Sequence, residues 1–165
     1  MIVGIISDTH DNLPLVDKAV KKLNGEGVAL VLHAGDYVAP FVIPKFKELK
    51  ARIVGVLGNN DGDRELLKKR AAEHGNMELR GNFAEIQAGN VKIALIHGHE
   101  DELLKALINS QSFEVVVHGH THMAEIYRKG STLVVNPGEV CGYITGKSTI
   151  ALLDTERLES KIIEL

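Results

Sequence analysis

Five short polar motifs in this sequence contain the residue types that bind divalent metal ions. They are Asp8-Thr9-His10, Gly35-Asp36, Gly58-Asn59-Asn60-Asp61, His97-Gly98-His99 and His118-Gly119-His120-Thr121-His122. Carboxylate and amide oxygens together with imidazole nitrogens suit Mn, Fe, Ni or Zn, rather than an all-sulfur structural site. One metal ion rarely needs as many as seven protein ligands, and these motifs offer at least that number. Two ions that share a bridging carboxylate would use seven. The motifs therefore indicate a two-metal centre.

Each motif by itself also has an ordinary structural explanation. An aspartate after a strand is often a turn former or a helix N-cap, and Gly-Asp or Gly-Asn-Asn-Asp resembles a turn. The two histidine motifs are harder to explain in this way, because histidine is scarce and usually scattered. This chain has 8 histidines but only 4 Phe, 3 Tyr and no Trp. The occurrence of all five motifs therefore favours one functional centre over five unrelated turns.

The motifs follow five apolar segments that predict buried strands. These segments are Ile2 to Ser7, Val28 to His33, Ile53 to Leu57, Val91 to Ile96 and Phe113 to Val117. A continuous apolar run is typical of a strand that is covered on both faces. In α/β sheets, ligands bind at the carboxyl ends of strands, and glycine there permits close approach of the backbone. The motifs thus stand where a ligand site is expected.

The other segments predict helices and hairpins around these strands. Helical patterns cover 13–23, with Asn12 as N-cap, and then 41–49, 63–74 and 100–108. Hairpins are expected at Gly89-Asn90, at Lys129-Gly130 and between the apolar segments 148–153 and 158–163. The sequence therefore predicts an α/β fold, a two-sheet β-sandwich flanked by helices, with 1–165 forming a single domain.

The composition is that of one globular domain in a reducing compartment. The chain has 165 residues, of which 44% are hydrophobic and 25% charged. The lone Cys141 cannot form an intrachain disulfide, and we expect a small buried hydrophobe or an idle thiol. The first apolar run has no basic n-region and ends at Asp8, so we do not expect it to be a signal peptide, and no apolar run reaches the ~20 residues of a membrane helix. We expect a cytoplasmic protein without a membrane partner, and the net charge of −3 argues against binding long nucleic acid.

The ordered series Asp-x-His, Gly-Asp, Gly-Asn-x-Asp, His and Gly-His-x-His resembles the calcineurin-like metallophosphoesterases. The short chain and its Asn136-Pro137-Gly138 are similar to the single-domain phosphodiesterase branch, which is related to the retromer subunit that shares the fold. The resemblance implies a metal-dependent phosphoesterase with two divalent ions, Mn before Ni, Fe or Zn, and a metal-bridging hydroxide as nucleophile. It implies that one ion binds Asp8, His10 and His122, that the other binds Asn59, His97 and His120, and that Asp36 bridges the two.

Position 60 departs from the family pattern. The family commonly has Gly-Asn-His-Asp or Gly-Asn-His-Glu, and its histidine contacts the phosphate and helps the leaving group depart. Asn60 can donate a hydrogen bond to a phosphate oxygen, but it cannot act as a general acid near neutral pH. The sequence therefore predicts a phosphodiesterase of small substrates that prefers activated aryl diesters to alkyl monoesters. His99 is the second candidate substrate contact, either as a substitute acid or as a wall of the pocket.

Two other functions stay open at this point, a non-catalytic interaction scaffold with a vestigial metal site and a nuclease of the same superfamily. The complete set of ligand residues argues against the scaffold, and the acidic net charge argues against the nuclease. His33 and His118 either orient ligands or are satisfied core histidines, and His74 is expected near the end of a helix. An exposed hairpin edge would also allow a homodimer.

Overall fold

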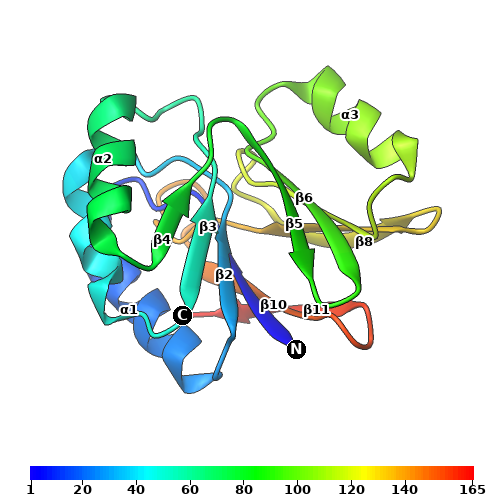
Figure 1. Ribbon diagram of the computed structural model, residues 1–165, viewed down its shortest axis with the longest axis horizontal. Helices are drawn as coiled ribbons and strands as arrows, with labels where there is room; N and C mark the ends of the chain where they lie inside the picture. Colours follow the sequence, from blue (N-terminus) through cyan, green and yellow to red (C-terminus); the bar gives the residue numbers. More distant parts are fainter.

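The computed structural model describes residues 1–165, and its centre is a pair of β-sheets that pack face to face (Figure 1). The first sheet has six strands in the order β11-β10-β1-β2-β3-β4. Its strands are β1 (Ile2–Ile6), β2 (Leu30–His33), β3 (Arg52–Gly55), β4 (Met77–Leu79), β10 (Thr149–Asp154) and β11 (Glu159–Glu164). Because β1 to β4 run parallel, their carboxyl ends lie at one edge, whereas β10 and β11 form an antiparallel hairpin beside β1.

The second sheet has five strands in the order β5-β6-β7-β9-β8. Its strands are β5 (Phe83–Ala88), β6 (Val91–Ile96), β7 (Val115–Val117), β8 (Ala124–Lys129) and β9 (Thr132–Pro137). The three central strands run parallel, and each edge strand belongs to an antiparallel hairpin. This mixed arrangement confirms the three hairpins that the turn residues predict, including that of β10 and β11 in the first sheet.

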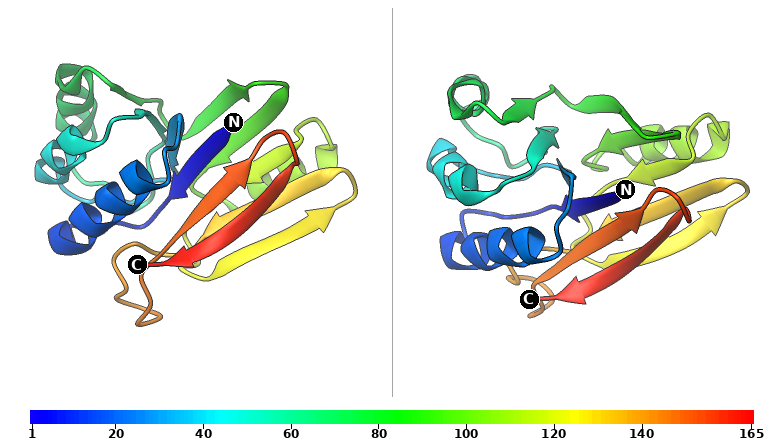
Figure 2. Two further views of the ribbon diagram at one scale, coloured as in Figure 1. Left: turned by 90° about the horizontal axis from the view of Figure 1, so that it is seen from below. Right: turned by 60° about the horizontal axis from the view of Figure 1, so that its bottom comes forward.

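Helices cover the outer faces of both sheets (Figure 2). They are α1 (Leu13–Gly25), η1 (Pro40–Glu48), α2 (Arg64–His74) and α3 (Asp101–Ser110). The first three pack on the first sheet, and α3 packs on the second. None of these helices has the length and apolar character needed to cross a membrane.

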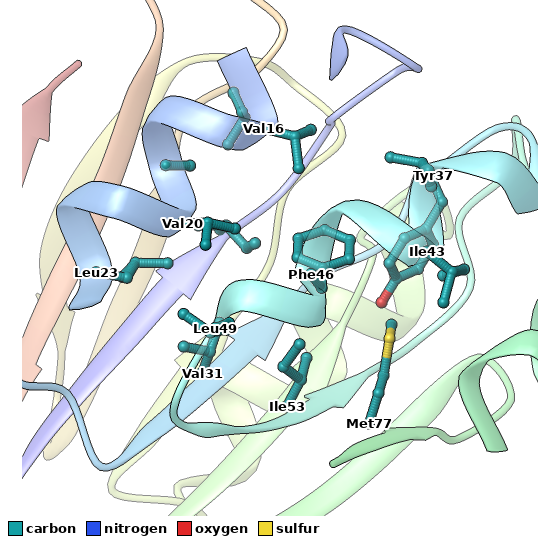
Figure 3. Close-up of a cluster of buried hydrophobic side chains, with 14 of the residues drawn as sticks. Val16, Val20, Leu23, Val31, Tyr37, Ile43, Phe46, Leu49, Ile53 and Met77 are labelled. Carbon is teal, nitrogen blue, oxygen red and sulfur yellow. The ribbon is translucent and has the colours of Figure 1, made fainter. Parts of the chain in front are cut away.

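The side chains of β1 divide the core into two layers. Val3 and Ile5 pack between the sheets, whereas Ile6 belongs to the cluster under the helices, part of which Figure 3 shows. All three are fully buried, and burying an aliphatic side chain of this size stabilises a fold by about 1.5–3 kcal/mol. Gly4 lets α1 lie close to the sheet, because a Cβ at this position would overlap Leu23 Cδ2. The sheet that carries the first motifs is therefore held rigidly from both sides.

The two-sheet sandwich confirms the predicted fold class, but three local details differ from the prediction. The sequence pattern missed β4, which at three residues is too short for a period to be recognised. The helix expected over 41–49 is the 3₁₀ segment η1, which contains Pro44, a residue without the backbone donor that an α-helix needs. Asn12 makes no capping hydrogen bond; its Nδ2 instead donates to Cys141 O at 2.8 Å and so ties two loops together.

Candidate metal centre

The five motifs meet where the carboxyl ends of strands from both sheets converge. Hydrogen bonds join the loops that follow these strands. Within the first sheet, Asp8 N–H donates to Gly35 O at 3.0 Å, and within the second, Gly119 N–H donates to His97 O at 2.9 Å. His120 N–H donates to Asp8 Oδ2 at 3.1 Å, and this bond crosses from one sheet to the other. The site therefore lies at the junction of the two sheets.

Asp8, His10 and His122 form the first group of candidate ligands. One ligand atom from each lies within 4.8 Å of the other two. Asp8 Oδ1 is 3.5 Å from Nε2 of His122 and 3.6 Å from Nε2 of His10. Asp8 Oδ1 and His10 Nε2 are both buried without a hydrogen-bond partner, although buried polar atoms are normally satisfied. These orphaned atoms fit a divalent cation, for which carboxylate oxygen and imidazole nitrogen are suitable ligands.

Asn59, His97 and His120 form the second group. Nδ1 of His97 donates to Ala34 O at 2.8 Å, so the lone pair of Nε2 is directed into the site. This Nε2 lies 3.1 Å from Asn59 Oδ1, and the ring centroid of His97 lies 5.2 Å from that of His120. A hydrogen bond from the other ring nitrogen is the usual way in which a protein orients a metal-binding imidazole.

Asp36 lies between the two groups. Its Oδ2 is 3.3 Å from Nε2 of both His10 and His97. Asn60 holds the same carboxylate, because its Nδ2 donates to Oδ2 at 2.7 Å and its N–H donates to Oδ1 at 2.9 Å. Burial by itself would raise the pKa of Asp36, but the side chains of His10 and His97 hold it well below its usual range. An anionic carboxylate that faces imidazoles on both sides has the position expected of a bridging ligand.

The two predicted substrate contacts lie at the same centre. Asn60 is exposed on the loop after β3, and its side-chain amide is bonded to Asp36. The ring centroid of His99 lies 5.6 Å from that of His97 and 6.2 Å from that of His120. Nδ1 of His99 is buried without a partner, so this imidazole borders the second ligand group with an unused polar atom.

His33 and His118 contact the main chain of the site loops. Nδ1 of His33 accepts from Gly35 N–H at 3.1 Å, and its Nε2 lies 3.3 Å from Thr9 Oγ1. Burial lowers the pKa of His33 to about 3, so this ring is neutral. Nδ1 of His118 lies 3.1 Å from Gly119 O. Both are satisfied core histidines whose hydrogen bonds brace the loops, and neither has a hydrogen bond to a candidate ligand side chain.

Glu139 is a site residue that the sequence analysis missed. It is fully buried just after β9, and its Oε2 accepts from Nδ1 of His122 at 2.7 Å. Burial by itself would raise the pKa of Glu139, but hydrogen bonds from Cys141 and His122 lower it to about 2. The thiol of Cys141 is thus buried but not idle, since it donates to Glu139 at 3.0 Å. The one sequence signal for Glu139 is its place directly after Asn136-Pro137-Gly138, and no spacing connects it to His122.

Five of the candidate ligands have a left-handed backbone. Their φ angles are 52° for Asp8, 37° for His10, 59° for Asp36, 68° for His120 and 63° for His122. Asp and His adopt this conformation more readily than most residues, but it costs L-residues roughly 1–2 kcal/mol. Strain of this kind persists where the surrounding structure over-determines it, and it clusters at functional sites.

We expect Gly58→Ala to weaken both the fold and the metal site. A Cβ at Gly58 would overlap Asp36 Oδ1 and lie 2.7 Å from Asp36 N. Such overpacking should lower the free energy of unfolding by about 1–3 kcal/mol and displace the carboxylate. Urea unfolding and calorimetric titration with Mn²⁺ measure the two effects. The matched control is Gly25→Ala, where no atom lies within 4 Å and no loss is expected; equal behaviour of the two variants would contradict the prediction.

We expect the affinity for metal ions to rise with pH because of His10. The carboxylates of Asp36 and Asp8 raise the pKa of His10 to about 9, so a metal ion must displace a proton from this ring. The apparent affinity for Mn²⁺ should therefore rise about tenfold per pH unit between about pH 6 and 9 and then level off. Conversely, the stability that the protonated ring gives the metal-free fold is complete below about pH 6.5 and is lost through about pH 9. Calorimetric titrations over this range test the prediction, and a flat affinity profile would disprove it.

Comparison with known proteins gives close relatives over the whole chain. A phosphodiesterase of Methanocaldococcus jannaschii is 42% identical over 165 residues, which cover 100% of this chain and 99% of the relative. A probable metallophosphoesterase of Methanothermobacter thermautotrophicus is 30% identical over 172 residues, which cover 99% of this chain and 92% of the relative.

Solved structures and a family model agree with these sequence relatives. The structure of an archaeal phosphodiesterase has a TM-score of 0.96 and 42% identity over 100% of both chains. Vps29 of Entamoeba histolytica in complex with zinc has a TM-score of 0.74 and 25% identity over 99% of this chain and 91% of its own. The family described as "Calcineurin-like phosphoesterase superfamily domain" matches residues 1–158. The resemblance that the motifs suggest is thereby confirmed, and the chain belongs to the calcineurin-like phosphoesterase superfamily.

Proposed function

We propose that this protein is a phosphodiesterase that uses two divalent metal ions, Mn²⁺ by preference, to hydrolyse small phosphodiesters. The observation that carries the proposal is the position of Asp36, whose Oδ2 lies 3.3 Å from Nε2 of His10 and of His97. The family of the chain and its phosphodiesterase relative support the same class of reaction. When bound, two divalent ions lower the pKa of water and stabilise the charge on the phosphoryl oxygens.

Seven side chains would hold the two ions. Asp8, His10 and His122 would bind the first ion, Asn59, His97 and His120 would bind the second, and Asp36 would bridge the two. The ligands come from both sheets, so the sandwich works as a single domain over 1–165. Hydrogen bonds on Nδ1 of His97 and of His122 leave the Nε2 atoms for the ions. The chain thus supplies an oriented set of nitrogen and oxygen ligands before any ion binds.

The preference for diesters with good leaving groups follows from Asn60. Its neutral side-chain amide donates to Asp36 Oδ2 and cannot protonate a departing oxygen near neutral pH. His99 is then the remaining group that could donate a proton, and it borders the second ligand group on the side of His120. Substrates whose leaving group needs no proton should therefore react fastest.

A substrate panel run with Mn²⁺, Ni²⁺, Fe²⁺ and Zn²⁺ tests the proposal. We expect metal-dependent hydrolysis of a bis-aryl phosphate, slower hydrolysis of alkyl monoesters, and none of oligonucleotides. Hydrolysis of oligonucleotides at comparable rates would instead support a nuclease. If metal-loaded protein turns over no ester, the protein is a binding scaffold and the proposal is wrong.

A further inference from the structure

Glu139 accepts hydrogen bonds from several groups besides His122. Its side chain is fully buried, and its two oxygens accept hydrogen bonds from six donor groups. These donors are Nδ1 of His122, Sγ of Cys141, the backbone N–H groups of Tyr143, Ile144 and Thr145, and Oγ1 of Thr145. A buried carboxylate is costly in free energy unless it is fully hydrogen-bonded. These six donor groups therefore compensate for the burial of Glu139.

The hydrogen bond to His122 determines which ring nitrogen carries the proton. A carboxylate can only accept, so the 2.7 Å contact with Glu139 Oε2 requires a proton on Nδ1. Nε2 of the neutral ring then carries the lone pair, and it lies 3.5 Å from the orphaned Oδ1 of Asp8. With the proton on Nε2 instead, the same ring would present a donor to the site and could not bind a cation there.

Glu139 itself is placed by the loop that follows it. Oε1 accepts from Thr145 N–H and Thr145 Oγ1, and Tyr143 N–H donates to Oε2 at 3.1 Å. This loop is joined to the first motif, because Cys141 N–H donates to Asp8 O at 3.0 Å. The carboxylate is thereby fixed on the side of His122 that faces away from Asp8.

Glu139, His122 and Cys141 could also be taken for a metal site of their own, since their ligand atoms lie within 4.8 Å of one another. The hydrogen bonds argue against this reading. A carboxylate offers about four lone-pair sites, and six donor groups already share them. A metal ion at this place would have to displace several backbone donors, which have no other partner in the loop.

We propose that Glu139 is a positioning residue that fixes His122 in the Nδ1-protonated form and so makes its Nε2 available to the first metal ion. This inference rests on the ligand assignment of the proposed function. It extends that assignment to a residue outside the ligand set and outside the motifs. The loop 141–145 acts with Glu139, because it supplies the donors that hold the carboxylate in place.

The first test reads the protonated nitrogen of His122 directly. Long-range ¹H–¹⁵N spectra of the metal-free wild-type protein distinguish the two neutral forms of each imidazole. We expect a mildly alkaline sample to show His122 protonated on Nδ1 and unprotonated on Nε2. A His122 protonated on Nε2 would overturn the proposal, whatever any variant does.

The second test is Glu139→Gln, measured by calorimetric titration with Mn²⁺ alone. The amide can donate to Nδ1 of His122 and move the ring proton to Nε2, so we expect metal affinity to fall about 10- to 100-fold. The matched control is Glu65→Gln, which makes the same change at an exposed carboxylate of α2 that pairs with Lys68 Nζ at 3.2 Å, and its affinity should stay within about threefold of wild type. A folded Glu139→Gln protein that binds Mn²⁺ as tightly as wild type would overturn the proposal. Neither test measures hydrolysis, so a metal-loaded wild type without turnover would overturn the proposed function alone.

Discussion

Asp36→Asn is expected to reduce hydrolysis of a bis-aryl phosphate by about 1,000-fold or more. The substitution removes the negative charge that lies 3.3 Å from Nε2 of His10 and of His97, and with it the group assigned to bridge both ions. Metal ions stabilise the transition state by several kcal/mol, and each 1.36 kcal/mol corresponds to about a tenfold change in rate. Steady-state kinetics together with the metal content of the purified protein measure the effect.

The control for this substitution makes the same chemical change at the surface. Asp17→Asn on α1 removes a partly exposed carboxylate that pairs with Lys45 Nζ at 2.8 Å and belongs to neither group of candidate ligands. We expect wild-type metal content and turnover for this variant. Wild-type turnover of the Asp36→Asn protein would instead show that the two ligand groups do not share this carboxylate.

Asn60→His is expected to raise turnover of aryl or alkyl monoesters by about 100-fold. The substitution restores a side chain that can carry a proton to the leaving oxygen, and general acid catalysis contributes about 10²- to 10⁴-fold. Diesters with good leaving groups should change little, because their departure does not need that proton. The ratio of monoester to diester turnover is therefore the quantity to compare.

Asn60→Gln is the matched control, since it keeps a neutral amide at position 60. We expect no gain in monoester turnover for it, although the longer side chain alters the contact with Asp36 Oδ2. If Asn60→His also brings no gain, the explanation of the diester preference is wrong, and His99 becomes the group to substitute next.

Those parts of the fold that depend on long apolar runs could be predicted from the sequence. The segments that end in the five motifs are all strands, and three of them adjoin one another in the first sheet. The proximity of Asp8, Asp36 and Asn59 was predictable because the carboxyl ends of neighbouring parallel strands lie at one edge of a sheet. The strand pattern thus predicted which loops of the first sheet come together.

The rest depends on contacts that no local pattern encodes. Glu139 meets His122, which lies 17 positions earlier in the chain, because two loops of the second sheet fold onto each other. Asn12 has the residue type of an N-cap, but a tertiary hydrogen bond to Cys141 O takes its side chain away from the helix. In both cases the partner is fixed by the packing of the sheets, so the residue type by itself could not predict the role.

The left-handed backbone of the candidate ligands bears on how such a centre evolves. Glycine adopts this conformation without the clash of a Cβ, so replacing His120 by glycine would relieve roughly 1–2 kcal/mol of local strain while deleting a candidate ligand. Selection for stability alone would therefore not keep a histidine at this position. If these residues bind the proposed ions, selection for metal binding, rather than for stability, keeps the strained side chains in place.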